Sequence, residues 1–201
     1  TNAMTVIVND SAQNVLTIGA VSGAIVKLET NSIVSLTGDV THGGTFTLQD
    51  DGDGTINVSG ATTFNAAIGA NADDLGTLNI TGATTVGAAS FIKDVNVGAN
   101  TIFTGDMNAD TVDVTGAATT VTISDKLLTA SGVSSVLTMN VTDQKVIANT
   151  ADVISADIRA VTDGFGEVEV AADSGVMTGN IGTSTTVKVG LLDMNKNLTT
   201  S

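Results

Sequence analysis

An internal repeat of about 22 residues constrains the fold of this chain more than any other feature of its sequence. Segments 33–38, 55–60 and 77–82 share one pattern, which reads IVSLTG, TINVSG and TLNITG. Two apolar residues flank a polar residue in each copy, and a Ser or Thr and then a Gly follow. The closing glycines are 22 residues apart. This alternation is typical of a short β-strand that buries one face.

The same alternation of apolar and polar residues recurs along most of the chain. Its apolar pairs are Val6/Val8, Leu16/Ile18, Val34/Leu36, Phe46/Leu48, Ile56/Val58, Leu78/Ile80, Val95/Val97, Val112/Val114, Val121/Ile123, Val168/Val170 and Val187/Val189. Short strands that repeat at this period predict an all-β parallel β-helix, a solenoid with coils of about 22 residues. A β-sandwich is the alternative, because segment 111–116 repeats the pattern at half the period and sandwich turns recur about every 8–12 residues.

A solenoid would explain several features of composition. We expect the closing glycines to adopt positive φ at the coil corners, and we count segment 101–105 with its Gly105 in the same series. Thr and Asn on stacked coils can form hydrogen-bonded ladders. Proline would remove a ladder donor, and the chain has none. About nine coils at the usual strand spacing would form a rod roughly 40 Å long.

The repeat divides the chain into three parts. Residues 1–4 read as a cloning remnant or an N-terminal arm, residues 5–125 as the repetitive β-helix, and residues 126–201 as a less regular β continuation with a C-terminal cap. Within the last part, segments 126–130 and 148–160 could each hold a helical turn.

Charge and composition narrow the classes of partner. The formal net charge is −14, and 18 Asp stand against three Glu, which places the acid in turns rather than in helices. Such a surface repels nucleic acid and anionic lipid, and the chain has no apolar run long enough to span a membrane. We therefore expect neither a nucleic-acid partner nor direct insertion into a membrane. Cysteine is absent, so disulfides and thiolate metal sites are excluded.

One acidic turn is the candidate metal site. Asp50, Asp51 and Asp53 alternate with glycines between two strand pairs, and calcium takes oxygen ligands from such turns. No Glu closes the turn as a full calcium loop requires, so a plain polar turn is the other interpretation. Segment 73–74 is a second, weaker acidic pair that we expect in a solvated loop.

No catalytic residues can be assigned. His42, the single histidine, is followed by two glycines, which predicts a loop tip and excludes a site built from several histidines. A polysaccharide-acting enzyme could use carboxylates alone, and it would need a groove lined with them. The expectation is that the chain is not an enzyme.

Segments 54–63 and 76–85 read GTINVSGATT and GTLNITGATT. Over about residues 33–125 the sequence resembles passenger repeats of rickettsial outer-membrane autotransporters and Thr/Gly/Ala-rich surface-layer proteins of bacteria. The resemblance implies a secreted, extracellular protein of the bacterial cell surface. The leading hypothesis is a structural subunit that self-associates through its coil ends. An adhesin or passenger module that binds a host or surface ligand is the alternative.

Overall fold

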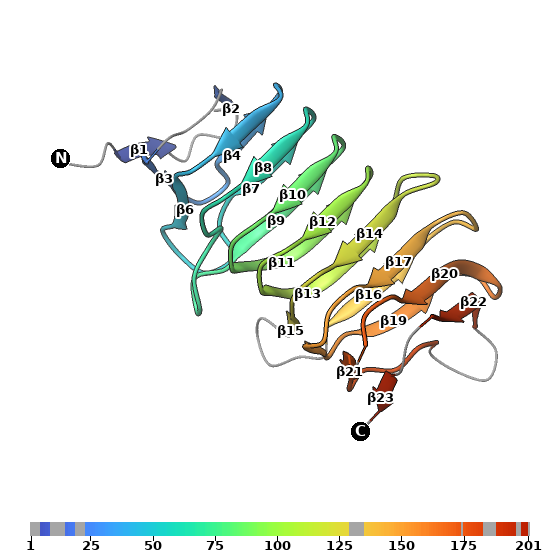
Figure 1. Ribbon diagram of the computed structural model, residues 1–201. Helices are drawn as coiled ribbons and strands as arrows, with labels where there is room; N and C mark the ends of the chain where they lie inside the picture. Colours follow the sequence, from blue (N-terminus) through green and yellow to red (C-terminus); the bar gives the residue numbers. More distant parts are fainter. Residues whose placement is uncertain are drawn as a thin grey trace.

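The computed structural model describes residues 5–8, 15–18, 23–128, 135–173, 175–182, 188–195 and 198–200. Their strands form a parallel β-solenoid with three faces (Figure 1). β1 and β2 lie at one end of the rod, and β22 and β23 lie at the other. Strand pairs are parallel throughout these residues, and the sole antiparallel contact among them is the isolated bridge between Ala70 and Asp73. Parallel pairing excludes the β-sandwich, whose sheets are antiparallel.

Each face is a column of strands stacked along the rod. Face 1 contains β1 (Thr5–Val8), β3 (Ile25–Leu28), β6 (Thr45–Leu48), the first halves of β11 (Ser90–Val97) and β13 (Met107–Val114), β15 (Leu127–Leu128), β18 (Val153–Ile154), β21 (Gly175–Met177) and β23 (Leu198–Thr200). Face 2 contains β2 (Val15–Ile18), β4 (Ile33–Leu36), β7 (Thr55–Val58), β9 (Leu75–Ile80), the second halves of β11 and β13, β16 (Val136–Met139) and β19 (Asp157–Ala160).

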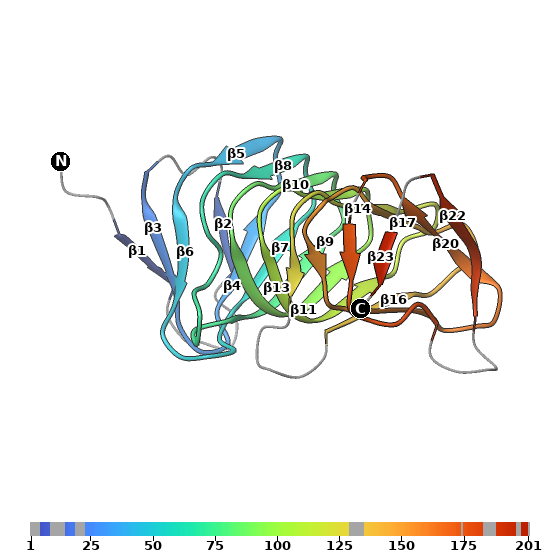
Figure 2. The same ribbon diagram turned by 60° about the horizontal axis from the view of Figure 1, so that its bottom comes forward.

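Face 3 is a single sheet of eight strands. Each coil contributes one strand to it, so the described residues form about eight turns. Its strands are β5 (Val40–His42), β8 (Thr62–Phe64), β10 (Thr84–Val86), β12 (Thr101–Phe103), β14 (Thr120–Ile123), β17 (Lys145–Ala148), β20 (Phe165–Val170) and β22 (Val189–Met194). Figure 2 shows β5, β8 and β10 following one another along one edge of the rod.

The predicted coil length is confirmed, with local departures. Asn79 stacks on Asn57 at a separation of 22 residues, whereas Asn96 stacks on Asn79 at a separation of only 17 residues. The coil that leads from Thr111 to its partner Val136 is longer than either. Because the three faces keep their register through these changes, the corners between the strands absorb the difference in length.

The core fills the inside of the coils. Strands alternate between half-buried outward residues and fully buried inward ones, and the largest inward side chains include Phe46, Phe64 and Phe103. Each coil is too thin to bury these side chains alone, so neighbouring coils supply the contacts. Burial of one such side chain stabilises the fold by about 1.5–3 kcal/mol.

The closing glycines have a different role from the predicted one. Gly38, Gly60 and Gly82 are not among the described residues with positive φ, so the expected corner conformation is wrong. Instead the glycines stack directly on one another. A Cβ atom added to Gly60 would collide with the carbonyl group of Gly38, and one added to Gly82 would collide with that of Gly60. Glycine is required here because the backbones of successive coils approach too closely for any side chain.

Two further predictions need correction. Segment 101–105 belongs to face 3 through β12, not to the face 2 series, and Gly105 packs against Ala88. The helical turns are also wrong. Residues 127–128 form β15, and segment 148–160 contains β18 and β19, while residues 129–130 lie outside the described part. Both segments continue the strand columns because their apolar residues fill core positions such as Leu127 and Ile158.

The strand columns run past residue 125 without interruption. β14 pairs with β17 and β13 pairs with β16 across this point. The division at residue 125 therefore marks a loss of sequence regularity within continuous sheets. The remnant or arm expected at residues 1–4 lies outside the described residues.

Candidate functional site

The acidic turn joins β6 to β7 and holds its carboxylates in separate local contacts. Asp53 is 8% exposed and accepts a hydrogen bond at Oδ2 from the Asp50 backbone N–H at 2.9 Å. The Thr30 hydroxyl approaches the same oxygen at 3.4 Å from the preceding coil. Asp53 therefore closes the turn on itself, as Asp commonly does.

Asp51 points to the following coils instead. Its Oδ2 lies 2.9 Å from Nζ of Lys93, which is two coils away, and its Oδ1 accepts the Asp74 backbone N–H at 3.1 Å. The hydrogen bond from Lys93 holds the pKa of Asp51 below its usual value, and the same contact raises the pKa of Lys93. The ammonium group therefore serves as the counter-ion of this turn.

Asp74 is buried, which corrects the expected solvated loop for half of segment 73–74. Asp73 is exposed, but Asp74 is 3% exposed, and its Oδ1 has no hydrogen-bond partner among the described residues. Burial raises the pKa of Asp74, and the charges of Asp51 and Asp110 raise it further. The sequence hid this because Asp74 directly precedes β9, where one residue of offset decides between core and solvent.

Calcium at Asp50, Asp51 and Asp53 stays a prediction. Within the described part of the chain, no three His, Cys, Asp or Glu side chains converge as metal ligands would. A cation at this turn would also meet the Lys93 ammonium, which already occupies the Oδ2 side of Asp51.

His42 is a core residue, and the predicted loop tip is wrong. It ends β5, its side chain is fully buried, and its ring stacks on Phe64 with ring centres 5.5 Å apart. Phe46 meets the same ring edge-on at 5.9 Å. Burial lowers the pKa of His42, which favours the neutral ring. A signal was present, because segments 39–42, 61–64 and 83–86 read DVTH, ATTF and ATTV, with His42 in the core column of Phe64.

A shallow groove of about 510 Å³ lies on the outer surface of face 3, and we call it the face 3 groove. It crosses β5, β8, β10 and β12. Its lining consists of Asp39, Val40, Thr41, Ala61, Thr62, Thr63, Ala83, Thr84, Thr85, Asn100 and Ile102. The repeated ATT segments 61–63 and 83–85 form much of this groove, but no pattern within them predicted that they would line one site.

Beyond the groove, the outward surface of face 3 becomes charged. Lys145 Nζ lies 2.7 Å from Oε1 of Glu167 and 2.7 Å from Oε2 of Glu169 on the next strand. Asn195 Nδ2 donates to Glu169 Oε1 at 2.8 Å. The hydrogen bond from Lys145 lowers the pKa of Glu169 most, and the hydrogen bond from Asn195 lowers it further. These contacts connect the last coils to one another. The outward positions of the described strands β17, β20 and β22 carry charged and apolar side chains instead of the threonines that line the groove.

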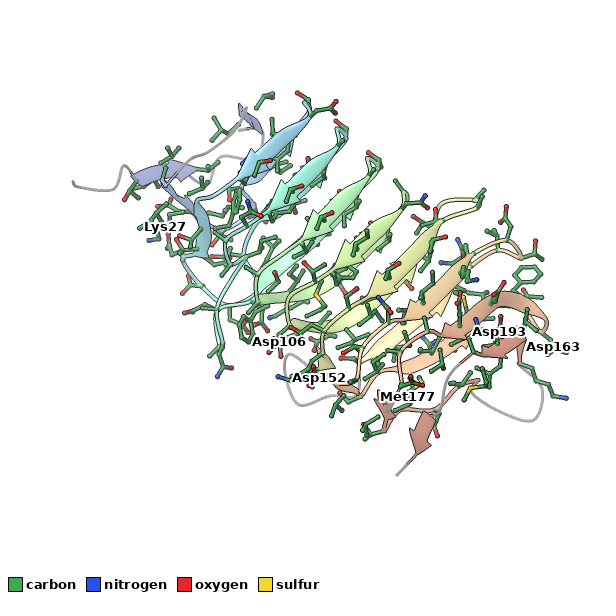
Figure 3. The ribbon with its side chains drawn as sticks, in the orientation of Figure 1. Lys27, Asp106, Asp152, Asp163, Met177 and Asp193 are labelled. Atoms are coloured by element: carbon green, nitrogen blue, oxygen red, sulfur yellow. The ribbon has the colours of Figure 1, made fainter. Side chains whose placement is uncertain are left out.

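The C-terminal end of face 3 exposes residues that belong to the core pattern. Leu192 and Met194 continue the inward columns of Val168 and Val170. The two valines are 0% and 1% exposed, whereas Leu192 and Met194 are each 45% exposed. Figure 3 shows Asp193, which lies between them in sequence, together with Asp163 at this end of the rod.

Acidic side chains also lie close together at a corner of successive coils. Figure 3 shows Asp106 and Asp152 near each other at the corner of neighbouring coils. Burial raises the pKa of Asp125, and the charges of Asp106 and Asp152 add to that effect. The predicted placement of Asp in turns is confirmed here.

Comparison with protein-family models, with curated proteins and with solved structures found no match. In the described residues no helix is long and apolar enough to cross a membrane.

Proposed function

We propose that this chain is a structural protein of the bacterial cell surface, an extracellular β-solenoid that assembles end to end. The single observation that carries the proposal is the open end at β22. Leu192 and Met194 occupy core positions there, yet each is 45% exposed. Exposed apolar surface of this kind favours a contact with another chain.

Each end of the solenoid finishes in strands that are paired on one side only among the described residues. β22 ends the eight-stranded sheet, and it pairs only with β20 among the described residues. β5 ends the same sheet on the opposite side, and β1 and β2 end the other two faces. Unpaired backbone groups on an edge strand are a template for another strand. A second copy with the same chain direction presents parallel edges at the spacing that the coils already use.

The surface-layer and autotransporter resemblance supports this proposal at the level of sequence composition. Thr-rich and Asp-rich coils without cysteine suit an extracellular protein that is built from stacked strands rather than from disulfides. The net charge of −14 limits lateral clustering of the rods at low salt, because like-charged flanks repel each other. Assembly through the uncharged core at the ends avoids most of this repulsion.

The test compares the wild-type chain with Leu192→Lys in light scattering and negative-stain imaging at increasing protein concentration. The wild type should form linear oligomers, and Leu192→Lys should remain monomeric because a charge then lies in the end contact. Leu191→Lys is the matched control, since Leu191 lies on the same strand but in the outward column of Glu167. Circular dichroism checks that each variant folds.

A wild type that stays monomeric at every concentration would contradict end-to-end assembly. Oligomers that Leu191→Lys abolishes and Leu192→Lys leaves intact would also contradict it, because the contact would then lie on the flank of the rod. Repeating the series with calcium and with chelator shows whether calcium contributes to the same contact.

A further inference from the structure

The face 3 groove has a regular inner geometry. Thr41, Thr63 and Thr85 stand in register on three successive strands and point outward, and Ile102 follows them on β12. Parallel strands are about 4.8 Å apart, so the groove repeats its contacts at that step over about 14 Å. A ligand that itself repeats along its length can use every step, whereas a compact ligand can use one or two.

The side chains of this groove offer hydroxyl groups and small apolar surfaces together. Each threonine presents a hydroxyl, which both donates and accepts, beside a methyl group. Ile102 adds apolar area at one end and is 42% exposed. Ala61 and Ala83 are exposed members of the lining, and their small side chains leave the groove open. Sugar rings have the matching chemistry, with hydroxyls at their edges and C–H groups on their faces.

Two polar groups at opposite ends of the groove are held in place by backbone bonds. Oδ1 of Asp39 accepts the Ala61 N–H at 3.0 Å, which leaves Oδ2 of this carboxylate to accept from a ligand. Oδ1 of Asn100 accepts the Thr120 N–H at 2.8 Å, and its Nδ2 is a donor. Groups fixed before binding lose less conformational entropy when a ligand arrives.

Charge defines the class of ligand. Asp39 is the charged residue among those that line the groove, and no Lys or Arg stands with it in that lining. Polyanions would meet a carboxylate and a strongly acidic protein without a cationic partner. Polycations would find one carboxylate among neutral groups. We propose that the face 3 groove binds a neutral polysaccharide chain, which lies along the rod axis across β5, β8, β10 and β12.

The test is affinity electrophoresis of the full chain in native gels that contain laminarin, hydroxyethyl cellulose, xylan or dextran, with polygalacturonate as the anionic comparison. At least one neutral polymer should slow the protein, and polygalacturonate should not. The double variant Thr63→Val/Thr85→Val removes two hydroxyls at nearly constant volume. It should weaken binding about tenfold, since two hydrogen bonds to the polymer are lost.

A matched control exists on face 2. Thr55 and Thr77 are also outward-facing and in register one coil apart, but they lie outside the groove, so Thr55→Val/Thr77→Val should bind as the wild type does. Ala83→Leu should block the groove without touching the core. The proposal is overturned if no neutral polymer slows the protein, or if both double variants bind alike. It does not rest on end-to-end assembly, because Leu192→Lys should bind the same polymer.

Discussion

His42 shows how one buried side chain can make the stability of a solenoid depend on pH. Its ring packs against Phe64 and Phe46 in the core, and burial lowers its pKa below the ordinary 6.5. The unfolded chain therefore takes up a proton at a higher pH than the folded chain does. The contribution of His42 to the unfolding free energy is therefore fully present above the pKa of this residue in the unfolded chain. It is lost as the pH falls through and below that value.

We expect the urea midpoint of the wild type to fall between about pH 7.5 and about pH 5.5, and His42→Leu to flatten that part of the profile. Asp74 acts in the opposite direction, because burial raises its pKa and its protonation at lower pH stabilises the fold. The difference between the wild type and His42→Leu isolates the contribution of the histidine. Parallel pH profiles for the two proteins would show that folding does not change the pKa of His42.

Lys93 is the second single residue with a testable role, because it pairs with the acidic turn at 2.9 Å. Its side chain and that of Asp51 are 33% and 50% exposed, so solvent weakens the pair. Lys93→Met should cost less than about 1 kcal/mol of unfolding free energy in urea denaturation. Lys126→Met is the control, since its contact with Asp106 is longer, at 3.6 Å, and should cost less still.

The same variant tests the predicted calcium site. An ammonium group and a calcium ion would compete for the same oxygen of Asp51. Calcium should therefore raise the melting temperature more in Lys93→Met than in the wild type. Equal shifts, or no shift in either protein, would argue that calcium does not bind at Asp50, Asp51 and Asp53.

At the scale of strands, face 2 holds an amide ladder of the kind that the sequence predicted. Asn79 Nδ2 donates to Asn57 Oδ1 at 2.8 Å, and Asn96 Nδ2 donates to Asn79 Oδ1 at 2.8 Å. The next position in register is Asp113. A carboxylate cannot donate to the Asn96 oxygen, so the ladder ends there.

Asp113→Asn should extend the ladder by one hydrogen bond and stabilise the protein by about 0.5 kcal/mol. The urea midpoint is the measurement. Asp143→Asn removes the same charge from an exposed turn outside the ladder, and it should change the midpoint less. Equal gains in both variants would assign the effect to net charge alone.

The strands could be predicted from the sequence because the alternation of apolar and polar residues is a local property. The face on which each strand lies is not a local property, because it depends on the length of every preceding coil. Segments 101–105 and 33–38 look alike, yet β12 lies on face 3 and β4 on face 2. The coil between Asn79 and Asn96 is shorter than the one between Asn57 and Asn79, and this shortening shifts the later strands relative to the repeat. No local sequence pattern indicates the change in coil length. The face 3 groove and the contact of Lys93 with the acidic turn, which both depend on the register of the coils, were therefore not predicted.

The same limit explains the outcome at the candidate sites. The acidic turn was found from three neighbouring aspartates, but its partner Lys93 is 42 residues from Asp51 and appears only when the coils stack. Asp39 and Asn100 line opposite ends of the same face 3 groove, and this too appears only when the coils stack. Contacts between coils require the register of every intervening coil, and an error of one residue reverses the faces.

On the scale of the whole molecule, a solenoid is held together mainly by contacts between adjacent coils. Its stability is therefore distributed along one dimension, with central coils supported on both sides and end coils on one. Amide hydrogen exchange should be slowest in the strands of the middle coils, such as β9 and β11, and fastest in β22, whose outer edge pairs with no described strand. Exchange at one common rate in all strands would show a single cooperative unit instead.

End-to-end assembly should reduce the difference in amide hydrogen exchange between the middle coils and β22. At concentrations where oligomers form, β22 should become protected because its open edge then pairs with another chain, while β9 should not change. Leu192→Lys should keep the fast exchange of β22 at every concentration, and Leu191→Lys should gain protection like the wild type. If concentration protects the outward strands of face 3 evenly and leaves β22 open, the rods associate along their flanks. The face 3 groove would then lie in the contact, and polysaccharide binding should compete with assembly.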